Sequence, residues 1–234
     1  MTSQKQDWFR KKTWTEEDQK DFFTKLNRAR QSSKCQYLYL QACALAYTVA
    51  TAEAAIAVAE MGLAVADHEI QKVDIYGVQA VAFANLGKIP ETLNAYKSLF
   101  EIQKTKGCQG DYHIHFAKFL LRHHLTSHYG EGIDAIVDFG LKDNHDSIMP
   151  KLLFEDLYLL AFMYEDQTEY IKTLPDSDPD KQYYAEYVRL SKSFAGKALE
   201  ILGGNKDRQD SKQMFTVVTP EKGVKERLDK IMAS

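Results

Sequence analysis

Five of the seven histidines in this chain lie between positions 113 and 128, which makes metal binding the first chemistry to consider. They are His113, His115, His123, His124 and His128. His124 and His128 are four residues apart, so on an uninterrupted helix they would share one face at a distance that suits zinc. Thr126 and Ser127, however, stand at the expected end of that helix, and no HExxH glutamate or cysteine pair accompanies the histidines. We therefore expect no metal and no cofactor, and we interpret the histidines as lining a groove or the C-terminal end of a helix.

Pairs of adjacent acids raise the second chemistry, general acid–base catalysis. The pairs are Glu155 with Asp156 and Glu165 with Asp166. Neighbouring residues on a helix project to different sides, so we interpret both pairs as solvated faces or helix ends. The chain also lacks a glycine-rich phosphate loop, a G-x-S-x-G elbow and a Cys/His nucleophile signature. The sequence therefore predicts a protein that is not an enzyme.

Composition bounds the fold class. The 234 residues are 44% hydrophobic with a formal net charge of −3, so the chain can bury a full core and has no global basic field that would indicate nucleic acid binding. Glycine and proline are sparse, and alanine-rich and leucine-rich stretches replace any strand-like alternation. These features predict an all-α protein.

The cysteines and the N-terminus indicate the compartment. Cys35, Cys43 and Cys108 form no metal-ligand spacing, and the first two would lie about 12 Å apart along one helix, too far for a disulfide. The first eight residues contain no apolar signal core. The most apolar stretch, 42–66, contains Thr48, Glu53 and Glu60, so it fits a packed helical hairpin better than a membrane span. We therefore expect a cytoplasmic protein that does not insert into a membrane.

The segment 86–93 carries the strongest structural signal. A helix is predicted to end at Gly87, and the next to restart with Pro90 at its first position, where the missing N–H costs nothing. Weaker turns follow the same pattern near 48–51, 127–132 and 166–169, about forty residues apart. Thr15 and Asp178 are suited to cap the helices that follow them, and Ser32-Ser33 marks the turn after the first helix. The predicted helices after the first are 34–47, 51–66, 69–86, 90–104, 111–126, 130–140, 149–164, 169–174, 181–202 and 220–232.

The central hairpin resembles a tetratricopeptide repeat. The residues that carry the resemblance are Tyr76, Ala80, Phe83, Leu86, Gly87, Ile89, Thr92, Tyr96, Leu99 and Phe100. Thr92 stands where the repeat usually has alanine, and the pitch exceeds the usual length of about 34 residues, so the repeat is degenerate. The opening Trp8-Phe9-Arg10 and Trp14 are also similar to the start of some uncharacterised bacterial proteins with such repeats.

This resemblance implies a right-handed α-solenoid of stacked antiparallel helix pairs. Residues 1–33 would form an N-terminal capping helix, 34–204 the repeat domain, and 205–234 a flexible connector and a short C-terminal helix. The inner helices of such a solenoid line a groove for a partner. The groove positions carried over by register are Tyr39, Cys43, Tyr47, Asp74, Val81, Asn85, Ala117, Leu121, His124 and Leu125.

The resemblance implies a non-catalytic protein that binds a partner protein or peptide. The mixed groove argues against a clamp for a terminal carboxylate, and the specific hypothesis is an immunity protein that neutralises a cognate toxin in a bacterial cell. A small-molecule or peptide sensor that uses the same groove is the alternative, and a His-dependent metalloenzyme is a weaker one. Tyr183, Tyr184 and Tyr187 cannot all be core residues on one helix, so some are available to a partner or to a second copy of the chain in a homodimer.

Overall fold

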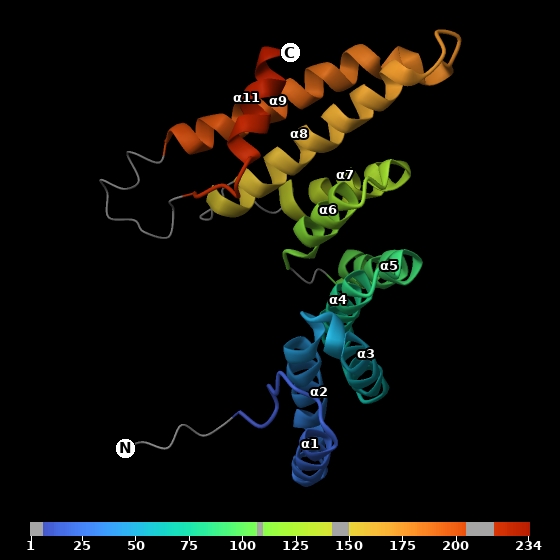
Figure 1. The fold of residues 1–234 in the computed structure, drawn as a ribbon, viewed down its shortest axis with the longest axis vertical. Coiled ribbons are helices and arrows are strands. Elements are labelled where there is room, and N and C mark those ends of the chain that lie inside the picture. Colours follow the sequence, from blue (N-terminus) through green and yellow to red (C-terminus); the bar gives the residue numbers. More distant parts are fainter. Residues whose placement is uncertain (1–6, 107–109, 142–149, 205–217) are drawn as a thin grey trace. The chain divides into compact units, whose positions relative to one another are not determined.

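The computed structural model describes residues 7–106, 110–141, 150–204 and 218–234, and every regular element within these ranges is a helix (Figure 1). The predicted all-α class is therefore confirmed for the described residues. The chain divides into two compact units, Met1–Gln109 and Gly110–Ser234. In the described ranges, no helix is long and apolar enough to cross a membrane.

The first unit is a series of helices joined by short turns. They are α1 (Glu16–Arg28), α2 (Gln31–Ala46), α3 (Val49–Ala64), α4 (Glu69–Asn85) and α5 (Ile89–Lys106). Helix α2 packs against α3, α3 against α4 and α4 against α5, and α2 also packs against α4 (Figure 1). The short turns make these neighbours helical hairpins.

The N-terminal segment packs on the start of this unit. Thr15 caps α1 as predicted: its hydroxyl accepts from the Asp18 N–H, and the Asp18 carboxylate accepts from the Thr15 N–H in return. The buried side chain of Gln41 holds the preceding segment, because it accepts from the Lys11 N–H at 3.0 Å and donates to the Lys11 carbonyl at 2.7 Å. Two hydrogen bonds from one buried amide fix where the N-terminal residues lie on α2.

The turn between α1 and α2 lies earlier than predicted. Ala29 and Arg30 are extended, whereas Ser32 and Ser33, which were expected to form the turn, lie in the first turn of α2. The Ser33 N–H donates to the Arg30 carbonyl, so Arg30 acts as the N-cap through its backbone alone. The serines suggested a turn by composition, but a serine is equally suited to the first turn of a helix.

The turn between α4 and α5 is built as predicted around Gly87. Its φ is +70°, and the Lys88 N–H donates to the Phe83 carbonyl at 3.0 Å while the Gly87 N–H donates to the Ala84 carbonyl at 3.1 Å. This pair of bonds is the Schellman arrangement that favours glycine at the left-handed position. Pro90 is the second helical residue rather than the first, because the Thr92 N–H closes the first turn on Lys88.

The second unit is built around one long helix. Its elements are α6 (Tyr112–Arg122), the 3₁₀ turn η1 (Thr126–His128), α7 (Tyr129–Ala135), the π-helix η2 (Ile136–Leu141), α8 (Pro150–Thr173), the 3₁₀ turn η3 (Pro179–Tyr183), α9 (Tyr184–Gly203) and α11 (Val224–Ala233). Helix α8 contacts α6, α7, η1, η2, η3, α9 and α11. In Figure 1, α8 and α9 run side by side as the longest pair, with α11 beside them. Asp178 caps η3 as predicted, since its carboxylate accepts from the Asp180 N–H.

The predicted turn at 166–169 is wrong, because α8 continues through it without a break. No glycine or proline follows Pro150 within this helix, and the Thr168 hydroxyl donates to the Tyr164 carbonyl within the helix instead of capping a new one. The predicted helix 111–126 is shorter than expected, since α6 ends at Arg122, and the predicted turn at 127–132 is occupied by η1 and the start of α7.

The C-terminal segment docks onto the second unit. The expected flexible connector lies outside the described residues up to position 217, but 218–234 forms an irregular stretch with a turn, followed by α11. Val224, Leu228 and Ile231 are buried, and α11 packs against α8 and α9. The Arg227 guanidinium lies 4.1 Å from the centre of the Phe162 ring. The short C-terminal helix therefore belongs to the core of the unit.

Two acids predicted to be a solvated pair hold this helix in place. Arg227 donates to Glu165 and to Asp166, each at 2.6 Å, and the buried Tyr129 hydroxyl donates to Asp166 at 3.0 Å. The interpretation of Glu165 and Asp166 as a solvated face is therefore wrong. Adjacent residues do point to different sides of a helix, but Arg227 is long enough to reach both carboxylates from α11.

Replacing Gly87 tests the α4–α5 turn. We expect Gly87→Val to lower the free energy of unfolding by about 1–3 kcal/mol, because a β-branched side chain resists the left-handed backbone. A Cβ at this position would meet no other atom within 4 Å, so the cost comes from the backbone alone. Gly130→Val is the matched control, since Gly130 is also free of close neighbours but has no positive φ. Equal denaturant midpoints for the two variants, followed by circular dichroism, would contradict the assignment.

Shortening a buried residue of α11 tests the docking of the C-terminal helix. Leu228 is fully buried, so Leu228→Ala should cost about 2–5 kcal/mol of unfolding free energy. Met232→Ala removes a side chain of similar size from the same helix, but Met232 is 45% exposed and its loss should cost much less. Urea unfolding of both variants measures the difference. A small effect at both positions would mean that α11 does not stabilise the second unit.

Candidate functional site

The structure brings the first two groups of predicted groove residues onto neighbouring helices. Tyr39 and Cys43 lie on α2 with Tyr47 directly after it, and Asp74, Val81 and Asn85 lie on α4. Because α2 and α4 contact each other, these residues belong to one surface of the first unit. We name the surface formed by Tyr39, Cys43, Tyr47, Asp74 and Val81 the α2–α4 face.

The centre of the α2–α4 face is half-buried and uncharged apart from one acid. Burial raises the pKa of the Tyr39 hydroxyl well above its usual range, and the neighbouring Cys43 and Asp74 add to the rise. Burial also raises the pKa of the Cys43 thiol, although its hydrogen bond with Tyr39 acts in the opposite direction. Both groups are therefore neutral at physiological pH, and Cys43 lacks the thiolate that a nucleophile needs. Side chains of this kind suit contact with a partner better than covalent chemistry.

The end of the α2–α4 face carries exposed apolar side chains. Tyr47 is 74% exposed and Val49, across the α2–α3 turn, is 65% exposed. Asn85 lies near the same turn, because its amide donates to the Ala46 carbonyl at 2.7 Å. Asn85 therefore caps the C-terminal end of α2. We predicted Asn85 as a groove position, and the bond shows that this side chain supports the fold.

The third group of predicted groove residues lies in the second unit and does not form a surface of the same kind. Ala117 is fully buried in α6, so it is a core residue and cannot contact a partner in this structure. Leu121 and Leu125 are half-buried, and His124 is exposed in the turn after α6 with a φ of 51°. The Leu125 N–H donates to the Leu120 carbonyl across that turn. His124 thus occupies the left-handed position that usually holds glycine or asparagine at a helix end.

The histidines do not converge on one point. Helix α6 ends at Arg122, so His124 and His128 do not share a helical face. His128 pairs with Glu131 at 3.1 Å, and His115 lies 3.7 Å from Asp111. The part of the chain that the structure describes contains no group of three or more His, Cys, Asp or Glu side chains arranged to hold a metal ion.

One histidine forms a buried charged contact that we did not predict. His113 on α6 and Asp156 on α8 are both buried, and His113 Nε2 lies 3.1 Å from Asp156 Oδ1. The contact is not aligned as a hydrogen bond, and neither side chain has another hydrogen-bond partner within the described ranges. A Cβ on Gly140 would lie 2.6 Å from Asp156 Oδ2, so only glycine leaves room for this carboxylate. The interpretation of Asp156 as part of a solvated pair is therefore wrong.

The backbone around this contact is irregular. Gly140 lies in the π-helix η2, which packs against α6 and α8. π-Helical turns occur frequently at functional sites. The recorded contact joins two buried side chains of α6 and α8, and we treat it as a structural feature of the second unit.

No protein-family model, curated protein or solved structure matches this chain. The assignment of a function therefore rests on the geometry of the chain itself.

The contribution of Asp156 to the free energy of unfolding should fall as the pH rises. Burial raises the pKa of the Asp156 carboxyl more than His113 lowers it. The native state therefore keeps a proton that the unfolded chain releases above about pH 4, and this contribution to the free energy of unfolding is lost as the pH rises through the native pKa. As the pH rises from about 4 to neutrality, we therefore expect the free energy of unfolding of the wild type to fall relative to that of Asp156→Asn.

Denaturant unfolding at several pH values measures this shift. Asp176→Asn is the matched control, because the Asp176 side chain is fully exposed and its substitution should give a difference that changes little with pH. A shift in favour of the wild type as the pH rises would show that the attraction of His113 outweighs the cost of burial.

Proposed function

We propose that this chain is a non-catalytic interaction protein, and that it binds a partner protein or peptide through the α2–α4 face. In this proposal α2–α5 form two degenerate tetratricopeptide-like helix pairs of a right-handed α-solenoid. The observation that carries the proposal is the contact between α2 and α4, the two helices that lie on the inner side of such pairs.

The packing of the central hairpin supports the repeat assignment. The small residue of the pattern on α4, Ala80, is fully buried. Thr92, which stands in place of the usual alanine, is also fully buried, and its hydroxyl donates to the Lys88 carbonyl at 2.8 Å. A threonine can therefore occupy this close helix contact because its polar group is satisfied within its own helix. Tyr96 and Leu99 of the pattern are buried as well.

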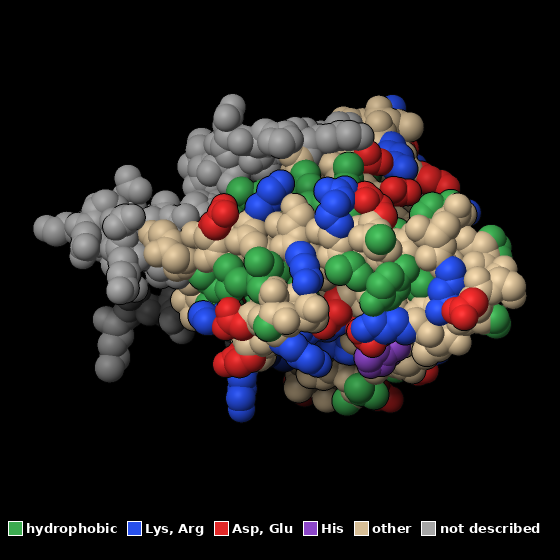
Figure 2. Space-filling view, turned by 90° about the horizontal axis from the view of Figure 1, so that it is seen from above, with side chains coloured by type: hydrophobic (Ala, Val, Ile, Leu, Met, Phe, Trp, Pro, Cys, Tyr) green, Lys and Arg blue, Asp and Glu red, His purple; other side chains and the backbone are tan. Residues whose placement is uncertain are grey.

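The distribution of charge favours a partner that is recognised by shape and aromatic contact. On the face of the molecule shown in Figure 2, acidic and basic side chains are interspersed with apolar ones. That face therefore carries no broad field of one sign of the kind that nucleic acids require. The α2–α4 face likewise offers tyrosine rings, a thiol and one carboxylate, which suit a mixed, partly aromatic contact.

An immunity protein remains the specific form of this proposal. A helical chain with a net charge of −3 and the proposed binding face fits a protein that neutralises a toxin by covering it. The test is to co-express a captured partner with this chain. If the partner harms the host when expressed alone, and the wild-type chain but not a variant of the α2–α4 face relieves the harm, the immunity role is supported. A partner that is harmless alone contradicts it.

A paired substitution tests whether the α2–α4 face is the binding surface. We expect Tyr39→Leu combined with Tyr47→Ala to weaken partner binding by about tenfold or more, about 1.4 kcal/mol, since aromatic anchors dominate such contacts. Leucine keeps an apolar side chain against the core at position 39, and Tyr47 is exposed, so the helical circular dichroism should be unchanged. Quantitative affinity capture from the native host, followed by mass spectrometry, measures the loss.

The matched control removes charges from another surface of the same unit. Glu91→Gln and Glu101→Gln change exposed residues of α5 and should leave capture unchanged. If the control abolishes capture and the tyrosine pair does not, the partner docks on α5 and the proposed face is wrong.

A further inference from the structure

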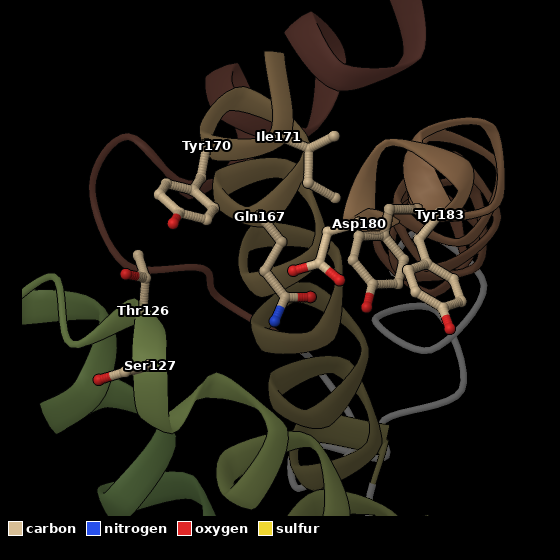
Figure 3. Close-up of a pocket in the computed structure, with 8 residues that line it drawn as sticks. Thr126, Ser127, Gln167, Tyr170, Ile171, Asp180 and Tyr183 are labelled. Atoms are coloured by element: carbon tan, nitrogen blue, oxygen red, sulfur yellow. The ribbon is translucent and has the colours of Figure 1, made fainter. Parts of the chain in front are cut away.

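The second unit contains a pocket that the proposed function does not use. It has a volume of about 300 Å³, which is at the small end for ligand sites. Its walls come from η1, α8, η3 and α9 (Figure 3). The residues that matter here are Ser127, Gln167, Tyr170, Asp180, Tyr183 and Tyr187. We name this site the tyrosine–carboxylate pocket.

The pocket has an acid and an unused acceptor. Among the described residues that line the pocket, Asp180 is the only charged one. Within the described ranges, the structure records no ion pair to the Asp180 carboxylate. The Oε1 atom of Gln167 is buried and has no hydrogen-bond partner there. The side chains of Gln167 and Asp180 point toward one another across the pocket (Figure 3). The buried Gln167 oxygen lacks a donor, and the exposed Asp180 carboxylate can accept as well, so the pair suits a ligand that brings N–H groups.

Aromatic rings flank these acceptors. Tyr170 lies on one side of Gln167 and Tyr183 on the other (Figure 3), and the two tyrosines are 52% and 46% exposed. Tyr183 and Tyr187 are stacked, with ring centres 6.0 Å apart. Such rings hold planar or cationic groups against their faces. Exposed tyrosines at the rim also mean that a ligand reaches the pocket from solvent.

We propose that the tyrosine–carboxylate pocket binds the guanidinium group of an arginine side chain that a polypeptide partner presents. A guanidinium is planar, stacks on tyrosine and carries donors in several directions, which matches a carboxylate on one side and an amide oxygen on the other. An ammonium group is a compact point charge that needs no stacking surface. One carboxylate is too few ligands for a metal ion, and the acid repels an anion.

This site is independent of the α2–α4 face, because all its residues belong to the second unit. Its occupancy can therefore be tested without knowledge of the partner. A single capped amino acid serves as the probe.

The experiment is an NMR titration of the full chain with N-acetyl-arginine amide. We expect shifts at the backbone amides of Gln167, Asp180 and Tyr183 and a dissociation constant near 1 mM, the scale of about 4 kcal/mol that one side chain can supply. Asp180→Asn should weaken binding about tenfold, because a hydrogen bond to a charged group is lost. Tyr170→Leu, which keeps an apolar side chain but removes the ring, should weaken it about threefold.

A control variant separates a local contact from the general charge of the unit. Glu200→Gln removes the same charge from α9, but 13 residues beyond Tyr187, about 20 Å along the helix. It should leave the dissociation constant unchanged. Equal weakening by Glu200→Gln and Asp180→Asn would overturn the proposal, because it would show non-specific attraction.

Three other probes define the chemistry. N-acetyl-citrulline amide has the same shape without the charge and should not bind, and N-acetyl-lysine amide should bind several-fold more weakly. If either binds as well as the arginine derivative, the pocket does not recognise guanidinium. If free arginine binds much more tightly than the capped form, the occupant is a free amino acid and not a polypeptide. The absence of any shift at the pocket also overturns the proposal.

Discussion

Both units depend on the close approach of helices at small residues. Alanines that are fully or almost fully buried line the helix contacts at Ala42, Ala46, Ala52, Ala55, Ala59, Ala80, Ala82, Ala161, Ala195 and Ala198. A glycine also allows a close helix contact in the second unit, because a Cβ on Gly132 would lie 2.8 Å from both Leu120 and Met163. Side chains this small bring backbones together and leave little tolerance for added volume. The register of each hairpin is therefore fixed by where these residues fall.

This constraint also explains where exposed aromatic side chains lie. Contacts made by alanine and glycine need few large side chains between the helices, so several aromatic residues remain at turns and rims. Tyr47 follows α2, Tyr170 lies near the end of α8, and Tyr183 ends η3. Each is about half exposed or more, and a tyrosine in such a position offers contact area at low entropic cost. The candidate binding surfaces are thus a consequence of how the core is packed.

Signals that act within a few residues were predictable from the sequence. The cap at Thr15, the left-handed Gly87 and the cap at Asp178 all depend on local hydrogen bonds or local backbone sterics, and the structure confirms them. Features that depend on residues far apart in the chain were not. Asp156 contacts His113 from 43 positions away, and Asn85 reaches the Ala46 carbonyl across 39 positions. The register of the third groove group failed for a similar reason, since the burial of Ala117 is set by how its helix packs.

The continuity of α8 shows how contacts between residues far apart in the chain determine whether a pocket can form. The sequence predicted a turn at 166–169, a stretch that consists of polar residues. Glu165 and Asp166 accept hydrogen bonds from Arg227 on α11, and the Thr168 hydroxyl donates within its own helix. These polar side chains therefore have partners while α8 stays helical. Eleven residues are close to three full turns, so Asp156 and Gln167 lie on the same face, about 16 Å apart. One end of that face therefore packs against α6 and η2, and the other carries Gln167 into the tyrosine–carboxylate pocket. A turn at 166–169 would have removed the wall that Gln167, Tyr170 and Ile171 provide, so the docking of α11 and the existence of the pocket depend on the same unbroken helix.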